Sequence, residues 1–249
     1  MRHLAENNTY KKNRFLAKDI LLLSLIILLT ISLLLVGIWS NGIIILNNLS
    51  NTINQQILYQ SVTLFITTIF LFILRRFKKT EFRKYFRKGN ISAKISPVPI
   101  IGINPKPGEN WFHLGRNFTI IISAVTTIII YFQLIRESGT SIGNFLHILP
   151  FSVVFALSNS FVEESITRLG VVIVLKGNVN DRNISLISAV IFGTVHYWGN
   201  PGGLIGVLAA GFLGWFLAKS IIETNGIFWA WFIHFVQDVI IFSALLSIQ

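Results

Sequence analysis

The 249-residue chain contains no cysteine. Without a thiol, it can form no disulfide, bind no metal through cysteine and carry no palmitoyl or prenyl group on cysteine. The sequence also lacks an HExxH zinc helix, a GxSxG nucleophile turn and a phosphate-binding glycine loop. Thiol chemistry is therefore excluded, and none of these common motifs accounts for a function.

Charge is also scarce in this chain. Charged residues make up 12% of it and hydrophobic residues 53%, whereas soluble domains carry about 25% charge. The composition therefore predicts an all-α fold, a polytopic integral membrane helical bundle. Seven apolar runs are long enough to cross about 30 Å of hydrocarbon, with room for an eighth transmembrane helix. These runs are Ile20–Trp39, Ile57–Leu74, Phe118–Ile135, Phe151–Leu175, Ile184–Trp198, Leu204–Ile222 and Ile227–Ile248.

Basic residues give the chain a formal net charge of +11 and gather in two places. One is the segment Arg75–Lys94, which could bind nucleic acid, but beside a predicted transmembrane helix a cytoplasmic anchor on anionic lipid is the better interpretation. The loop Ser40–Gln56 has no Lys or Arg, so the positive-inside rule predicts a cytoplasmic N-terminus. We expect a plasma-membrane protein without a nucleic-acid partner. The second place is the N-terminal tail, with Arg2, Lys11, Lys12, Arg14 and Lys18.

The proline-containing stretch Ile91–Asn110 predicts an extended linker. On this basis residues 1–90 form a tail, a two-helix transmembrane hairpin and the basic segment. Residues 91–117 are the linker, and residues 118–249 form the C-terminal bundle.

Six polar residues able to carry chemistry lie inside the apolar second half of the chain. A charge in hydrocarbon costs about 3 kcal/mol on insertion scales, so such residues normally face a bundle interior for a reason. They are Glu163, Glu164, Arg168, His196, His234 and Asp238.

The two adjacent acids differ in their helical neighbours. Glu164 and Arg168 are four residues apart, share a helix face and can form an internal ion pair. Glu163 lies about 100° round the helix from Glu164 and has no such partner. An unpaired carboxylate in low dielectric is a stronger base once ionised, so Glu163 is the catalytic candidate and the Glu164–Arg168 pair a support. The alternative is that both acids only hold helices together.

Two histidines on other predicted helices favour the catalytic interpretation. His196 ends the fifth apolar run, while His234 and Asp238 share one face of the seventh. A lone membrane histidine is commonly a hydrogen-bonding spacer, but two histidines and an unpaired glutamate on three helices form a constellation.

These residues fall into three ordered motifs. Glu163 to Arg168 fits EExxxR, Phe192 to His196 fits FxxxH, and His234 to Asp238 fits HxxxN/D. In order and placement the segment Phe118–Ile248 resembles the CPBP family, the CAAX protease and bacteriocin-processing (Abi-like) intramembrane glutamic endopeptidases, which are related to the Ras-converting CAAX endopeptidases.

The resemblance implies roles for the motif residues. Glu163 and His196 would activate a water, while His234 and Asp238 would stabilise the oxyanion. Many relatives have Asn at the position of Asp238, and an ionised Asp cannot donate a hydrogen bond. Asp238 is therefore either protonated or orients His234 from one turn away, and we favour orientation.

The resemblance also implies a peptide or membrane-protein substrate. Because CAAX processing is a eukaryotic task, maturation of a peptide or bacteriocin, or self-immunity, is the expected role in a bacterial membrane. No cofactor is expected, although a zinc site of Glu163, His196 and His234 is an alternative. A second alternative is a protein without proteolytic activity, either an immunity scaffold or a small transporter that uses Glu163 as proton carrier.

Overall fold

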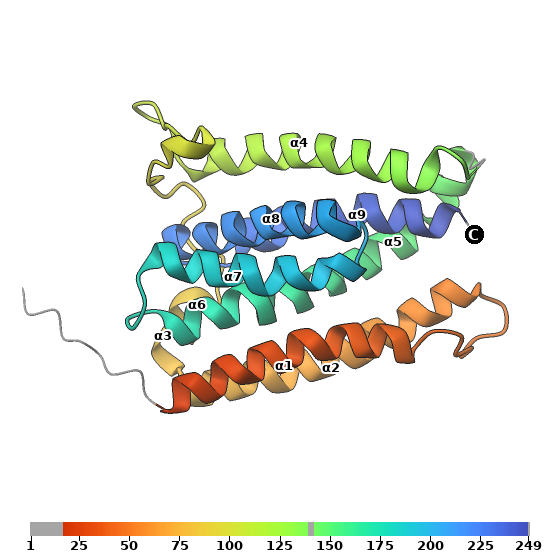
Figure 1. The fold of residues 1–249 in the computed structure, drawn as a ribbon, viewed down its shortest axis with the longest axis horizontal. Coiled ribbons are helices and arrows are strands. Elements are labelled where there is room, and N and C mark those ends of the chain that lie inside the picture. Colours follow the sequence, from red (N-terminus) through yellow and green to blue (C-terminus); the bar gives the residue numbers. More distant parts are fainter. Residues whose placement is uncertain (1–16, 139–141, 249) are drawn as a thin grey trace, which may run out of the picture.

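The computed structural model describes residues 17–138 and 142–248. Within these ranges the regular elements are helices, as the composition predicts. The basic residues Arg2, Lys11, Lys12 and Arg14 lie outside the described residues. The helices, shown in Figure 1, are α1 (Ala17–Trp39), α2 (Asn51–Phe77), α3 (Lys79–Tyr85), η1 (Pro99–Ile101), α4 (Trp111–Ile130), η2 (Tyr131–Ile135), α5 (Ile142–Glu163), η3 (Glu164–Gly170), α6 (Val171–Leu175), α7 (Asp181–Val195), η4 (His196–Trp198), α8 (Gly203–Thr224) and α9 (Phe228–Ser247).

The starts of α2 and α4 coincide with side chains that cap free backbone N–H groups. Ser50 accepts a hydrogen bond from the backbone N–H of Ile53 at the start of α2. Asn110 does the same for Phe112, and α4 therefore begins at Trp111, ahead of the apolar run from Phe118 that marked it in the sequence.

Six of the described helical stretches are long and apolar enough to span a membrane, which makes the chain a multi-pass membrane protein. The expected span Ile184–Trp198 is not among them. It corresponds to α7, which has 15 residues and ends in the short 3-10 turn η4. In Figure 1 the α7–α8 connection lies short of the end of the bundle that α1 and the C-terminus reach. The six stretches are Ala17–Trp39, Asn51–Phe77, Trp111–Ile135, Phe145–Leu175, Gly203–Thr224 and Phe228–Ser247.

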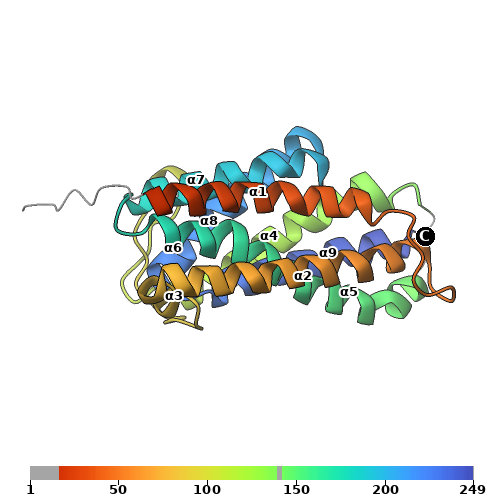
Figure 2. The same ribbon diagram turned by 90° about the horizontal axis from the view of Figure 1, so that it is seen from below.

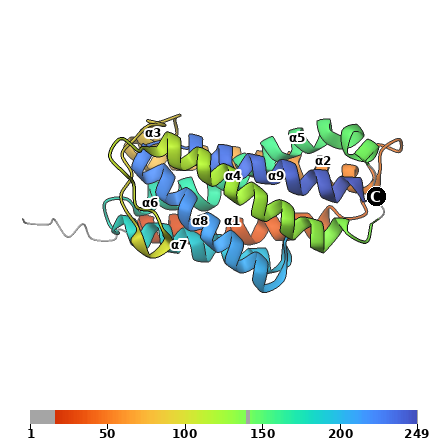
Figure 3. The same ribbon diagram turned by 90° about the horizontal axis from the view of Figure 1, so that it is seen from above.

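The helices form three layers (Figure 1). The α1–α2 hairpin covers one face of the layer that contains α5 to α9 (Figure 2), and α4 crosses the opposite face against α9 (Figure 3). One hydrophobic core joins the hairpin to the middle layer, with Ile26 and Phe70 packed together with Ile166. A Cβ atom on Gly170 would lie 2.9 Å from the Phe70 ring, so this glycine permits close approach of the hairpin.

Glycines also bring α7 and α8 into close contact. A Cβ on Gly193 would lie 2.9 Å from the carbonyl oxygen of Val207 and 3.0 Å from the Cα of Gly211. A Cβ on Gly214 would lie 3.2 Å from the Cα of Ala189. Small residues permit this close approach where no hydrophobic effect drives helices together in lipid.

A buried ion pair closes the end of the bundle that carries α3. Asp19 is fully buried, its Oδ1 lies 2.8 Å from Lys78 Nζ, and its Oδ2 accepts a hydrogen bond of 2.8 Å from Asn178 Nδ2. These contacts connect the start of α1 to the α2–α3 junction and to the α6–α7 turn.

The proline-containing segment between α3 and α4 packs against the α8–α9 end of the bundle. Trp111 Nε1 donates a 2.7 Å hydrogen bond to Glu223 Oε2. Lys219, which pairs with the same carboxylate, donates to the carbonyl oxygen of Ser96 at 2.9 Å. The segment is therefore folded onto the bundle; its treatment as a boundary between residues 1–90 and 118–249 stays a prediction.

Candidate functional site

The first motif lies where α5 changes into a π-helix. Helix α5 ends at Glu163, and η3 runs from Glu164 to Gly170 with the wider π-helical turn. Such segments occur frequently at functional sites. The two acids point to different surroundings, because the Glu163 side chain is 15% exposed whereas Glu164 is fully buried.

The ion pair expected from the sequence is present. Glu164 Oε1 lies 3.1 Å from Arg168 Nη1, and both side chains are completely buried. The same oxygen lies 2.7 Å from His234 Nδ1. Since a carboxylate can only accept, His234 Nδ1 carries a hydrogen and donates it to Glu164. Glu164 is therefore the closest orienting partner of His234, a contact the sequence did not predict.

Phe192 is the aromatic centre of the site. Its ring lies under the Arg168 guanidinium, whose carbon is 3.3 Å from the ring centroid. The same ring centroid lies 4.0 Å from that of His196 and 5.6 Å from that of His234. A cation–π contact of this kind stabilises a desolvated guanidinium, so Phe192 helps to hold the ion pair and both imidazoles.

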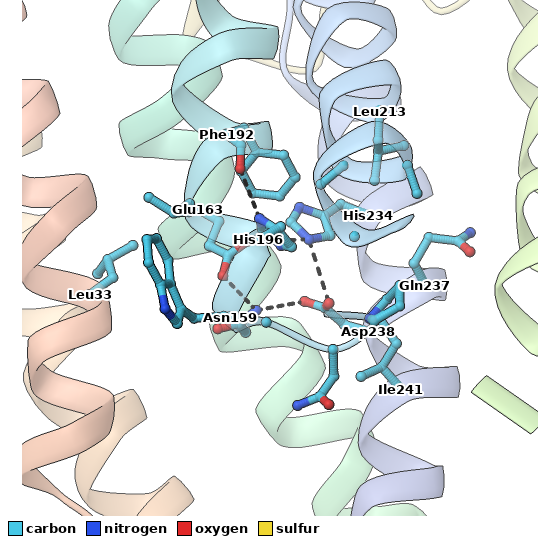
Figure 4. Close-up of a pocket in the computed structure, with 18 of the residues that line it drawn as sticks. Leu33, Asn159, Glu163, Phe192, His196, Leu213, His234, Gln237, Asp238 and Ile241 are labelled. Atoms are coloured by element: carbon cyan, nitrogen blue, oxygen red, sulfur yellow. Dashed lines mark hydrogen bonds and ion pairs between the residues drawn. The ribbon is translucent and has the colours of Figure 1, made fainter. Parts of the chain in front are cut away.

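Four side chains form a closed polar ring between α5 and α9, shown in Figure 4. Asn159 Nδ2 donates to Glu163 Oε1 at 3.2 Å and to Asp238 Oδ2 at 3.0 Å. On the other side of the ring, His234 Nε2 lies 3.5 Å from Glu163 Oε2 and 3.5 Å from Asp238 Oδ1. Each carboxylate thus has one oxygen on the amide and the other toward the imidazole.

His196 reaches the same region from the end of α7. Its Nδ1 lies 2.9 Å from the carbonyl oxygen of Phe192, one turn earlier. A carbonyl accepts hydrogen bonds, so Nδ1 donates and a neutral His196 keeps a lone pair on Nε2.

A cavity of about 990 Å³ connects these residues. Glu163, His196, His234 and Asp238 all line it, and Figure 4 shows their side chains gathered at one place in its wall. Much of the remaining wall is apolar and comes from α1, α4, α8 and α9, for example Leu33, Leu213 and Ile241. The hairpin also contributes polar residues, Gln55 and Tyr59 of α2.

Comparison with known proteins bears on the second half of the chain. Residues 145–240 match the model of a family described as Type II CAAX prenyl endopeptidase Rce1-like. Over these residues, which are fewer than half of the chain, the protein is similar to the Rce1-like family. No curated protein and no solved structure matches the chain. The match confirms the resemblance to CAAX endopeptidases, and this resemblance implies an intramembrane protease.

The Rce1-like segment contains the residues that sequence analysis selected, and the structure brings them together. It also contains Asn159 and Phe192, to which the sequence assigned no role. Asn159 could have been found, because it lies four residues before Glu163 and so on the same helix face. Tyr59 lies outside the segment, and only the packing of the hairpin reveals its place in the cavity wall.

The described residues give no support to the zinc alternative. Among residues 17–138 and 142–248, no group of three or more His, Asp or Glu side chains could hold a metal ion. In the set Glu163, His196 and His234, the Nδ1 atoms of both imidazoles are engaged by protein partners, which leaves only their Nε2 atoms for a metal ion; His234 Nε2 lies 3.5 Å from carboxylate oxygens of Glu163 and Asp238. We therefore derive no metal chemistry from these residues.

Proposed function

We propose that the protein is an intramembrane endopeptidase in which Glu163 and His196 activate the water that hydrolyses a peptide bond. One observation carries this proposal. Glu163 Oε1 is held by Asn159, whereas Oε2 is buried and has no hydrogen-bond partner among the described residues. A carboxylate oxygen of this kind, in a cavity also lined by a histidine, suits a general base.

In the proposed reaction, Glu163 Oε2 takes one proton from the water while His196 Nε2 accepts a hydrogen bond from the other. The water oxygen attacks the carbonyl carbon, and the carbonyl π electrons move to the oxygen. Glu163 then returns its proton to the peptide nitrogen as the C–N bond breaks. The products are a carboxylic acid and an amine, so the enzyme is regenerated.

His234 and Asp238 act on the oxyanion in this proposal. Glu164 accepts the hydrogen on His234 Nδ1, so His234 donates through Nε2 when it is an imidazolium. The carboxylate of Asp238, 3.5 Å from that nitrogen, favours this charged form. Preorganised donors of this kind commonly contribute about 100-fold or more to the rate.

We further propose a cytoplasmic N-terminus in a bacterial plasma membrane, with α7 and η4 as a seventh span. Arg75, Lys84 and Lys88 are exposed beside the end of α2, which supports a contact with anionic lipid rather than nucleic acid. Lys78 differs from them, because it is buried on Asp19.

The substrate we propose is a peptide or membrane protein, processed in peptide or bacteriocin maturation or in self-immunity. The apolar walls of the cavity support a substrate with apolar side chains. A non-proteolytic immunity scaffold is the second candidate, since the buried polar ring would also hold helix α5 against helix α9.

Purified protein in detergent, incubated with a panel of internally quenched apolar peptides, tests the proposal. The panel includes a farnesylated CAAX peptide, because the family description names a prenyl endopeptidase. We expect the wild type to cut at least one peptide, Glu163→Gln to cut none while staying folded, and a chelator to leave cleavage unchanged. Equal cleavage by Glu163→Gln, or no cleavage by the wild type, would reject the mechanism.

A further inference from the structure

The side-chain amide of Asn159 donates a hydrogen bond to both carboxylates of the polar ring. Asn159 is 8% exposed and lies on α5, one turn before Glu163, while Asp238 comes from α9. The amide nitrogen of an asparagine carries two hydrogens. Here one is directed to each acid, so the capacity of this donor is fully used.

This geometry distinguishes the two oxygens of Glu163. The hydrogen bond from Asn159 fixes Oε1 at 3.2 Å. Oε2 is left without a hydrogen-bond partner among the described residues and lies 3.5 Å from His234 Nε2, in a residue that lines the cavity. A carboxylate held by one oxygen cannot rotate freely about its last bond, so the other oxygen keeps one direction.

The same amide explains the acid at position 238. An asparagine there could offer its carbonyl oxygen to Asn159 only if its own NH₂ group turned toward His234 Nε2. Aspartate accepts with both oxygens, from Asn159 through Oδ2 and toward His234 through Oδ1. Without the amide, Glu163 and Asp238 would face each other as like charges in a low-dielectric site, which is unfavourable.

We propose that Asn159 is a positioning residue that presents Oε2 of Glu163 to the reacting water, and that Asp238 is an acid because it accepts from this amide. Many relatives have Asn at the position of Asp238, on α9. In this chain, whose third motif ends in Asp, Asn159 of α5 supplies the side-chain amide instead. The proposal rests on the proposed proteolytic function only for the expected effect on the rate of cleavage. The selection of Oε2, by which Asn159 holds Oε1 of Glu163 and leaves Oε2 as the reacting oxygen, is a property of the protein without substrate.

Infrared difference spectroscopy tests the selection of Oε2 of Glu163 without any substrate. The spectrum of the wild type minus that of Glu163→Gln isolates the carboxyl bands of Glu163. We expect these bands to shift in Asn159→Leu and in the smaller, polar variant Asn159→Ser, because Oε1 loses its donor. The matched control is Ser160→Ala on the next residue of α5, whose hydroxyl donates to carbonyl oxygens of its own helix. In this variant the Glu163 bands should stay in place. Unshifted bands in folded Asn159→Ser would overturn the proposal.

A paired exchange then separates positioning from mere support. Asn159→Asp places three carboxylates together and should lower both thermal stability and cleavage of the most rapidly cut quenched peptide. Adding Asp238→Asn returns an amide donor to the α5–α9 contact, so stability should recover. Cleavage should stay about 100-fold below wild type through kcat, since Glu163 still lacks its donor.

The outcomes separate the two hypotheses. If the double variant regains full kcat together with its stability, Asn159 acts only as support between helices and the positioning role is wrong. If the wild type cleaves no peptide but the Glu163 bands shift as expected, the proteolytic function fails while the selection of Oε2 stands.

Discussion

At the scale of single residues, the site is organised by the sharing of donors and acceptors. Glu164 Oε1 serves Arg168 and His234 together, and Asn159 serves Glu163 and Asp238 together. Buried networks of this kind are stable only when each member keeps its partners. A substitution at one residue should therefore also disturb the neighbouring side chains that share its hydrogen bonds.

Arg168→Met tests this dependence. The change leaves Glu164 without its cation and removes the contact of the guanidinium with Phe192. Breaking one half of a buried pair costs about 3–5 kcal/mol, so we expect a clear loss of thermal stability in detergent. Lys84→Met, at an exposed lysine of α3, is the control and should unfold like the wild type. Unchanged unfolding of Arg168→Met would show that Glu164 needs no cation.

Asp238 should tolerate an isosteric amide better than an apolar side chain. Asp238→Asn keeps an oxygen that can accept from Asn159 but turns its NH₂ group toward His234 Nε2, so peptide cleavage should fall and part of it should survive. Asp238→Leu removes both the partner of Asn159 and the group 3.5 Å from His234 Nε2, so cleavage should fall about 100-fold. Comparable rates for Asp238→Leu and wild type would remove Asp238 from the site.

At the scale of elements, close helix contacts decide where the motif residues meet. The π-helical turn η3 separates the surroundings of Glu163 and Glu164, and Ser188 of α7 donates a 2.9 Å hydrogen bond to the carbonyl oxygen of Thr167 within it. Helix α7 in turn lies close to α8, because glycines face each other there. The position of His196 at the end of α7 depends on this packing.

Two glycine substitutions at the α7–α8 contact provide a matched comparison. In Gly193→Ala the new Cβ would lie 2.9 Å from a backbone oxygen, so the helices must move apart. Overpacking of this kind costs about 1–3 kcal/mol, and displacement of His196 should also lower cleavage. In Gly211→Ala the nearest atom is 3.7 Å away, an ordinary contact. We expect that variant to match the wild type in thermal unfolding; equal behaviour of both variants would refute the packing argument.

At the scale of the whole molecule, the charge distribution sets the orientation in the membrane. The exposed basic segment after α2 and the α8–α9 turn lie at one end of the bundle, and the α1–α2 loop at the other (Figure 1). A reporter enzyme that works only in the cytoplasm should therefore be active when it is fused after Lys94. A reporter enzyme that works only outside the cytoplasm should be active when it is inserted in Ser40–Asn48. The opposite labelling would reverse the face from which a substrate reaches Glu163.

The sequence by itself determined the helical membrane class, the three motifs and the Glu164–Arg168 pair. Hydrophobic run length, helical spacing and the cost of buried charge act over short stretches of chain and can be evaluated without a fold. The same reasoning predicts seven spans. Six described helices are long and apolar enough, and the run Ile184–Trp198 gives no sign that its helix ends at Val195, so the seventh span stays a proposal.

Only the tertiary structure decided which groups share a hydrogen-bond donor or acceptor. The contacts of Asn159 with Asp238 and of Glu164 with His234 join residues 79 and 70 positions apart. The approach of the hairpin to the cavity depends likewise on packing between distant segments, as at Gly170 and Phe70. Such contacts depend on helix rotation and separation, which ångström-scale packing sets and local sequence patterns do not encode.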